Sequence, residues 1–173
     1  MTARSVLLLV ALALPAAPAI AQDADYSVSG GTLYATVRDW TVVKSEQFGC
    51  SAYPEAMPIV FNTPPAGGWQ LVLPYTSAAA EGEFPGSIDV DKYSFTDTYY
   101  GDGVWVYASF PLEMRQAVAE GQNIYVHVGP AETELNLSGS KAALLKVEEC
   151  WRDLTGWSAA TSSRAGTFAF SGD

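Results

Sequence analysis

Short runs in which apolar and polar residues alternate recur along this 173-residue chain. A period of two is typical of half-buried β-strands, because successive side chains of a strand point to opposite faces. The runs with this pattern, or rich in β-branched residues, are 33–37, 40–44, 59–61, 69–73, 123–129, 132–137 and 167–170. We expect strands in these places. Loops are expected at 49–58, which contains Cys50, and at 76–86, which is rich in Ala, Glu and Gly.

The clearest β-hairpin lies between residues 92 and 110. Its arms, 92–97 and 104–110, flank the turn sequence Tyr100-Gly101-Asp102-Gly103. In the second arm one face carries the residues Val104, Val106, Ala108 and Phe110. Trp105 and Tyr107 alternate with these residues and therefore fall on the opposite face.

Two further segments are predicted to be helices. Residues 111–120 form the shorter one, since Pro111 fits a first helical turn and Gly121 fits a left-handed stop. Residues 141–154 form the longer one, with Ser140 as the N-cap and Gly156 after the end. The stripe of the longer helix that should face the core contains Ala143, Leu144, Val147, Cys150, Trp151 and Leu154.

Together these elements predict an α+β domain. We expect a mostly antiparallel sheet of about six strands, packed by one long C-terminal helix and one short helix. The length of the chain fits one hydrophobic core. Residues 32–173 are therefore expected to form a single domain, preceded by a flexible lead at 22–31.

Residues 1–21 have the features of a cleaved export signal. Arg4 supplies a positive charge, residues 6–14 are all apolar, and Ala19-Ile20-Ala21 is a small-x-small cleavage site. The apolar run is shorter than the roughly 20 residues that a membrane-spanning helix needs. We expect a periplasmic protein of a bacterial envelope, with no integral membrane segment after processing.

Cys50 and Cys150 are the only cysteines in the chain. An even number of cysteines in an exported chain favours pairing, because the compartment is oxidising. Their separation fits neither a C-x-x-C redox motif nor a zinc site. We expect one structural disulfide and no metal ligands.

Acidic residues outnumber basic ones by nineteen to nine, and the formal net charge is −10. Nucleic acids and anionic lipids bind proteins through Lys and Arg, so this balance argues against both classes of partner. An acidic exterior can serve solubility alone, or it can guide a basic partner. Composition leaves both interpretations open.

No set of residues identifies a catalytic site or a cofactor. His127 is the only histidine, and an ordinary strand position explains it better than a general-base role does. Ser138-Gly139-Ser140-Lys141 matches the S-x-x-K pattern of penicillin-interacting enzymes, but the S-D-N and K-T-G motifs are absent. Acidic pairs such as Asp89 with Asp91 lack the remaining ligands of a calcium loop and are not expected to form a glycosidase cleft. We expect a non-enzymatic protein, with a hydrolase site near His127 as an alternative.

Aromatic side chains are concentrated in the predicted hairpin. Tyr99, Tyr100, Trp105 and Tyr107 are candidate binding residues, since rigid rings with polar tips mark many partner surfaces. The alternative is that both faces of the hairpin are covered, one by the sheet and one by a helix.

The C-terminal third of the chain resembles a family of small exported proteins of proteobacteria. The resemblance is carried by Glu134-Leu135-Asn136-Leu137-Ser138-Gly139, Ala142-Ala143-Leu144 and Cys150-Trp151, together with the earlier Trp40 and Cys50. In these features the chain is similar to invasion-associated locus B proteins, and less closely to accessory periplasmic proteins of type VI secretion. It departs from the first family in its number of cysteines and from both in the aromatic hairpin. The resemblance implies a non-enzymatic envelope role and transfers no catalytic residues.

The sequence therefore favours a periplasmic binding or accessory protein that acts through a surface. Trp105 and Tyr107 are its expected anchors, and an acidic exterior would steer a basic protein partner. A second hypothesis is a periplasmic inhibitor or immunity protein against a basic cell-wall hydrolase or toxin. A third is the hydrolase with a site near His127.

Overall fold

The computed structural model describes residues 30–55, 59–74, 81–129 and 131–157. These residues form ten strands and two helices, which confirms the predicted α+β class. In chain order the elements are β1 (Thr32–Val37), β2 (Trp40–Ser45), β3 (Gly49–Pro54), β4 (Val60–Thr63), β5 (Gln70–Pro74), β6 (Glu81–Val90), β7 (Tyr93–Asp102), β8 (Trp105–Ser109), α1 (Leu112–Glu120), β9 (Asn123–Val128), β10 (Ala131–Asn136) and α2 (Ser140–Thr155).

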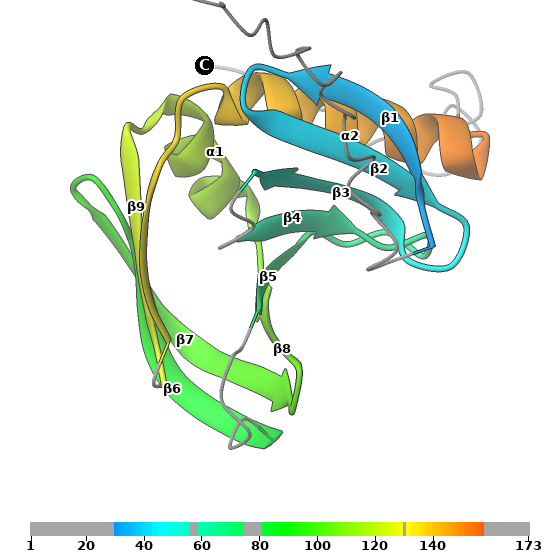
Figure 1. The fold of residues 1–173 in the computed structure, drawn as a ribbon. Helices are drawn as coiled ribbons and strands as arrows, with labels where there is room; N and C mark the ends of the chain where they lie inside the picture. The colour runs from blue at the N-terminus through cyan, green and yellow to red at the C-terminus, as the bar shows by residue number, and fades with distance from the viewer. Residues whose placement is uncertain (1–29, 56–58, 75–80, 130, 158–173) are drawn as a thin grey trace, which may run out of the picture.

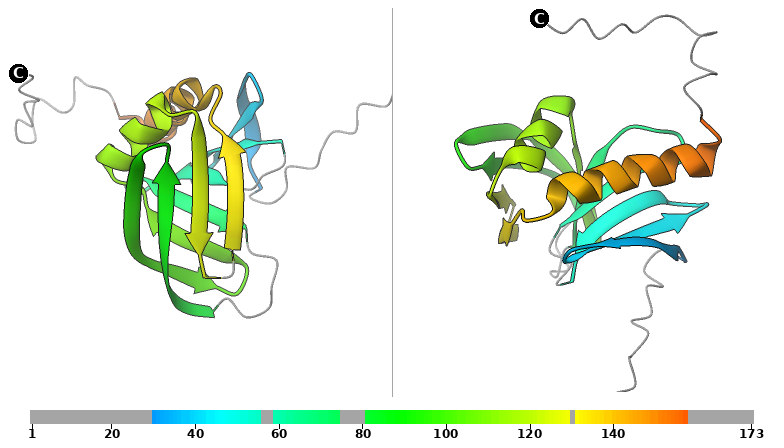
Figure 2. Two further views of the ribbon diagram at one scale, coloured as in Figure 1. Left: turned by 90° about the vertical axis from the view of Figure 1, so that its left-hand side faces the viewer. Right: turned by 90° about the horizontal axis from the view of Figure 1, so that it is seen from above.

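All the described strands belong to one sheet with the order β1-β2-β3-β4-β5-β8-β7-β6-β9-β10. Every neighbouring pair is antiparallel. The sheet is strongly bent: β1 to β4 lie beside α2, and β6, β7 and β9 stand at the other end (Figure 1). Both helices lie on the inner side of the bend. We call the opposite side of the sheet the outer face; its β6, β7, β9 and β10 end faces the viewer on the left of Figure 2.

The inner face of the sheet and the helices enclose the main hydrophobic core. Leu71 and Leu73 of β5 point into this core, as their period of two predicts. The long helix contributes the buried residues Ala143, Leu144, Val147 and Cys150, and Trp151 and Leu154 pack beside them. The predicted helical stripe is therefore confirmed. Removing these apolar side chains from water is the main favourable contribution to folding.

Trp40 of β2 contacts the segment between β10 and α2, at the opposite end of the chain. The Trp40 ring stacks on Phe61 with centroids 4.9 Å apart, and Phe61 stacks on Phe110 at 5.1 Å. The indole N–H of Trp40 donates to the carbonyl oxygen of Ser138 at 3.0 Å. Arg38, in the turn between β1 and β2, donates to the hydroxyl of Ser138 at 3.0 Å. These contacts hold the first hairpin against the segment that leads from β10 into α2.

A disulfide between Cys50 and Cys150 joins β3 to α2, as predicted. The two Cα atoms are 6.0 Å apart, and both cysteines are fully buried. The expectation of a loop at 49–58 is wrong for residues 49–54, which form β3. Cys50 and Ala52 fill the core from the inner face of this strand. The bridge therefore fixes the long helix to the interior of the sheet.

The sheet has more strands than expected, and β6, like β3, is a strand that was not predicted. The prediction of a connection at 76–86 is wrong for residues 81–86, which belong to this strand. Ile88 and Val90 bury its inner face. Gly86 is required for close packing, because a Cβ there would lie 2.5 Å from the carbonyl oxygen of His127 in β9. A glycine that suggests a turn in the sequence thus marks a close approach of two strands.

Both predicted helices are confirmed, but two of their predicted end residues act differently. Ser140 does not cap α2: Gly139, with φ +89°, is the N-cap, and the Ser140 hydroxyl donates to the carbonyl oxygen of Val118 in α1 at 2.7 Å. Gly121 follows α1 with φ −77°, so it is not a left-handed stop. A glycine is needed there for space, because a Cβ would lie 2.6 Å from Cγ1 of Val90.

The expected export signal at 1–21, most of the lead at 22–31 and the strand expected at 167–170 lie outside the described residues. In the part of the chain that is described, no helix has both the length and the apolar composition that crossing a bilayer requires.

Candidate binding surface

Trp105 and Tyr107 lie on the outer face, as the alternation within β8 predicts. Their neighbours Val106 and Ala108 are buried in the main core on the inner side. Trp105 and Tyr107 are themselves half-buried. They are therefore placed where a partner could contact part of each ring.

The register of the sheet brings further residues beside Tyr107. It lies opposite Val72 of β5 on one side and opposite Tyr100 of β7 on the other. Tyr100 in turn lies opposite Glu83 of β6. Tyr100 is 58% exposed, which makes it the most accessible aromatic residue of this group.

Trp105 and Tyr107 pack against a second, smaller hydrophobic cluster on the outer face. Its buried members are Val43, Tyr53, Val60 and Val72. One side of each aromatic ring thus packs against this cluster, and part of each ring is exposed to solvent. This arrangement lies between the two sequence hypotheses, because the outer side of β8 is neither fully free nor fully covered.

Tyr99 does not share this surface. It precedes Tyr100 in β7 but points to the inner side, where it is only 1% exposed. Burial raises the pKa of its hydroxyl to about 12. The structure therefore brings together Tyr100, Trp105 and Tyr107 and places Tyr99 in the core.

Asp102 organises the turn that presents these aromatic residues. Its Oδ1 accepts the backbone N–H groups of Trp105 at 2.7 Å and Val104 at 2.9 Å. Its Oδ2 accepts the hydroxyl of Tyr107 at 2.9 Å. The N–H of Trp105 is the main cause that lowers the pKa of Asp102, while burial and the bond to Asp102 raise the pKa of Tyr107 to about 12. Sequence reasoning placed Asp102 in the turn but missed this role.

The outer positions of β6 to β10 carry carboxylates and no Lys or Arg. Alternation and register assign these positions, since each lies opposite another outward residue such as Tyr100 or Tyr125. The acidic residues of this surface are Glu81, Glu83, Asp89, Asp102, Glu132 and Glu134. Tyr125 is exposed among them, and its hydrogen bond with Glu134 raises the pKa of its hydroxyl. We call these six carboxylates, together with Tyr100, Trp105, Tyr107 and Tyr125, the acidic aromatic face.

His127 lies on the same side of the sheet, in a row with Ser87 of β6 and Glu132 of β10. Its Nδ1 is 4.0 Å from Oε1 of Glu132, and both side chains are exposed. Among the described residues no side-chain hydrogen bond joins Ser87 to His127. A serine-type hydrolase needs a nucleophile activated by a base and free N–H groups for the oxyanion. β9 is paired on both sides, so its backbone groups are used within the sheet.

Two other sequence patterns have structural roles. Ser138 of the S-x-x-K match accepts a hydrogen bond from Arg38, as described above. The carboxylate of Asp91 accepts the backbone N–H groups of Gln122 and Asn123 at 3.0 and 3.1 Å, which fixes the start of β9. Within the described ranges, no group of three or more His, Cys, Asp or Glu side chains is arranged to hold a metal ion.

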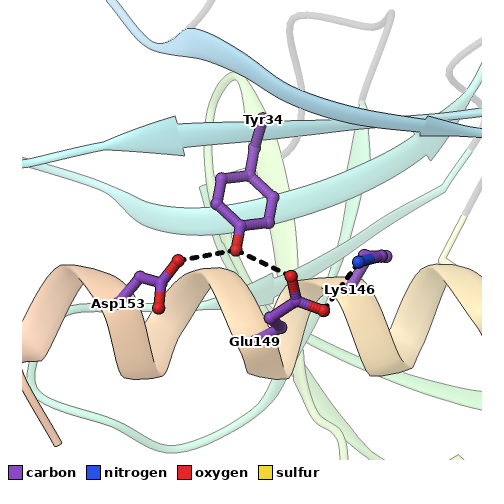
Figure 3. Close-up of polar contacts among 4 residues, drawn as sticks. All are labelled: Tyr34, Lys146, Glu149 and Asp153. Carbon is purple, nitrogen blue, oxygen red and sulfur yellow. Dashed lines mark hydrogen bonds and ion pairs between the residues drawn. The ribbon is translucent and has the colours of Figure 1, made fainter.

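A separate polar cluster fastens β1 to α2 (Figure 3). The hydroxyl of Tyr34 lies 2.7 Å from Oδ2 of Asp153 and 3.1 Å from Oε1 of Glu149. Lys146 donates to the other oxygen of Glu149 at 2.7 Å. The bond to Asp153 is the main cause that raises the pKa of Tyr34, and Lys146 is the main cause that lowers the pKa of Glu149. The cluster holds the first strand of the sheet on the long helix.

Comparison with known proteins finds a similarity in structure but none in sequence. By sequence, the chain matches no family model and no curated protein. By structure, it is similar to invasion-associated protein B from Bartonella henselae, with a TM-score of 0.46 and 17% sequence identity. The similarity covers 68% of this chain and 97% of that chain. This is the family that the C-terminal third of the sequence resembles.

Proposed function

We propose that this chain is an exported binding or accessory protein of a bacterial envelope, which presents the acidic aromatic face to a basic partner protein and catalyses no reaction. One observation carries the proposal. Partly exposed aromatic rings lie within a surface that contains six carboxylates and no Lys or Arg.

Each component of this surface has a distinct physical role in binding. Tyr and Trp side chains bury a large apolar area at a small entropic cost and dominate the energetics of many interfaces. Carboxylates of one sign attract a partner of the opposite sign and raise the rate of association. The smaller hydrophobic cluster beneath Trp105 and Tyr107 holds their rings in place, so little ordering remains to be done on binding.

The buried disulfide supports the exported location. Disulfides persist in oxidising compartments and are rare in the cytosol. Cys50 and Cys150 are fully buried, as expected for a structural bridge rather than a redox-active one. The export signal expected from residues 1–21 agrees with this location.

Photo-cross-linking from two positions tests the proposal. A photoreactive residue replaces Tyr100 on the acidic aromatic face or Leu145 on α2. These two side chains are matched in exposure, at 58% and 60%, but lie on opposite sides of the sheet. In the native periplasm, position 100 should capture a discrete basic protein and position 145 should not. Equal capture at both positions, or none at position 100, contradicts the proposal.

The identity of the captured protein then separates two forms of the function. A cell-wall hydrolase or toxin that loses activity on binding with one-to-one stoichiometry would indicate an inhibitor or immunity protein. A component of an envelope complex would indicate an accessory role. In both cases the capture should weaken as salt is raised, because screening reduces the attraction between the charges.

A further inference from the structure

We infer that the basic partner adds an extended strand to the free edge of β10, with its Lys or Arg side chains next to Glu132 and Glu134. The inference rests on the proposed function and specifies how the partner binds. β10 is the last strand of the sheet and pairs only with β9 among the described residues. The outward backbone N–H and C=O groups of such an edge strand are a template for another strand.

The side chains of β10 define the pattern that an added strand should have. Glu132 and Glu134 point to the outer face, and the Glu132 side chain is 82% exposed. Thr133 and Leu135 point to the inner face, where Leu135 packs against the main core. An added strand should therefore alternate basic residues on the outer face with apolar residues on the inner face.

Charge argues for a basic partner strand and against a second copy of this chain. If two β10 strands paired antiparallel about Thr133, Glu132 of each would lie opposite Glu134 of the other. Like charges in directly opposed positions destabilise a strand pair, whereas opposite charges stabilise it. The two glutamates therefore disfavour self-association and favour a strand that carries Lys or Arg.

The other edge of the sheet does not offer the same selectivity. β1 has no charged residue, and its exposed apolar residue is Leu33. A register shift between Leu33 and Ala35 also interrupts its pairing. β10 pairs with β9 in an uninterrupted register over its full length. Of the two terminal strands of the described sheet, β10 is thus the one with a regular edge and two carboxylates.

Capped synthetic peptides in which Lys alternates with Val provide the probe. The full processed chain is titrated with the peptide, and backbone amide signals and hydrogen exchange are followed by NMR. We expect shifts and added protection at the amides of β10. Two N-methylated peptides sharpen the test, because only alternate N–H groups of an added strand point toward β10. Methylation of one alternate set should abolish binding, and methylation of the other should leave it within about threefold of the parent peptide.

A matched pair of charge reversals separates edge recognition from general attraction. Glu132→Lys with Glu134→Lys alters the edge, and Glu113→Lys with Glu120→Lys makes the same change of charge at two exposed residues of α1, outside the acidic aromatic face. We expect the first variant to lose at least about tenfold in peptide affinity and the second to lose less than about threefold. Equal losses, or equal binding of both methylated peptides, would overturn strand addition. A partner could still be captured from position 100 if strand addition at β10 were disproved. The peptide experiments therefore test strand addition separately from the proposed binding function.

Discussion

The hydroxyl of Tyr107 donates to Oδ2 of Asp102 at 2.9 Å, while the other oxygen of the same carboxylate holds the turn before β8. One side chain therefore fixes both the path of the hairpin and the orientation of a candidate anchor. Asp102 is a positioning residue for the acidic aromatic face. Its replacement should change the pKa of Tyr107 while the protein still folds.

Tyr107 should titrate at about pH 12 in the native protein. Burial is the larger cause of this raised pKa and the bond to Asp102 the next, so Asp102→Asn should lower the pKa while leaving it above the ordinary value of about 10. Phenolate absorbance measures the change, and a Tyr107→Phe variant identifies the signal that belongs to Tyr107. An unchanged pKa in Asp102→Asn would show that the Asp102 carboxylate does not contribute to the raised pKa of Tyr107.

The same shift has a defined effect on stability. Because the folded pKa of Tyr107 is raised, its contribution is fully present below the unfolded pKa of about 10 and is lost as pH rises through about 12. Urea denaturation across this range should show a smaller loss of stability in Tyr107→Phe than in the native protein.

The disulfide should contribute strongly to stability, since it closes a loop with a sequence separation of 100 residues. The chain-entropy model gives about 4.7 kcal/mol for such a loop, and removal of a native bridge typically costs about 2–5 kcal/mol. The free energy of unfolding of Cys50→Ser with Cys150→Ser, measured in urea, should fall by an amount in this range. A loss below about 1 kcal/mol would show that contacts between α2 and β3 hold the helix without the bridge.

Gly49 and Gly68 form a matched pair for testing close packing. Their φ angles are nearly the same, at +87° and +84°. A Cβ at position 49 would lie 2.0 Å from the carbonyl oxygen of Thr63, whereas one at position 68 would meet nothing within 4 Å. Gly68→Ala should cost about 1–3 kcal/mol from backbone strain alone.

Gly49→Ala should cost a further ~2–3 kcal/mol or prevent folding, because the backbone of β4 must move to admit the methyl group. Denaturant midpoints of the two variants check this difference. Equal midpoints would mean that strand β3 and strand β4 can separate at little cost.

Ser140 and Ser138 provide a second comparison. The hydroxyl of Ser140 is buried and donates to Val118 of α1, whereas Ser138 contacts Arg38 at the surface. Ser140→Ala should cost about 1–3 kcal/mol, because it leaves a buried carbonyl without its donor. Ser138→Ala should stay within about 0.5 kcal/mol of the native protein. If the two variants unfold at the same urea concentration, Ser140 does not couple the helices.

Local patterns were sufficient to predict much of this fold. The period of two in β5 and β8 correctly grouped the residues that share a face of each strand, and the helical stripe around Cys150 gave the correct buried face of α2. In each case the pattern that allows the prediction lies within a single strand or helix. Strand β6 escaped prediction because residues 81–86 belong to a stretch rich in Ala, Glu and Gly, and the need for Gly86 becomes visible only with its neighbour β9 in place.

The candidate site was predictable only in part, because it depends on strand register. The alternation within β8 correctly separated Trp105 and Tyr107 from the buried side chains of Val106 and Ala108. The pairing of Tyr107 with Tyr100 and the gathering of carboxylates on β6 and β10 arise from contacts distant in sequence. The burial of Tyr99 could not be predicted either, since it depends on how β7 pairs with its neighbours.

The most direct test of the central claim is the equilibrium affinity of the protein captured at position 100, measured for the native chain, Tyr100→Ser and Leu145→Ser. The two variants remove side chains of similar exposure from opposite sides of the sheet. Tyr100→Ser should weaken binding at least about tenfold, as expected for an aromatic anchor, and Leu145→Ser should leave it within about twofold. Equal affinities for Tyr100→Ser and the native chain would contradict a binding function of the acidic aromatic face.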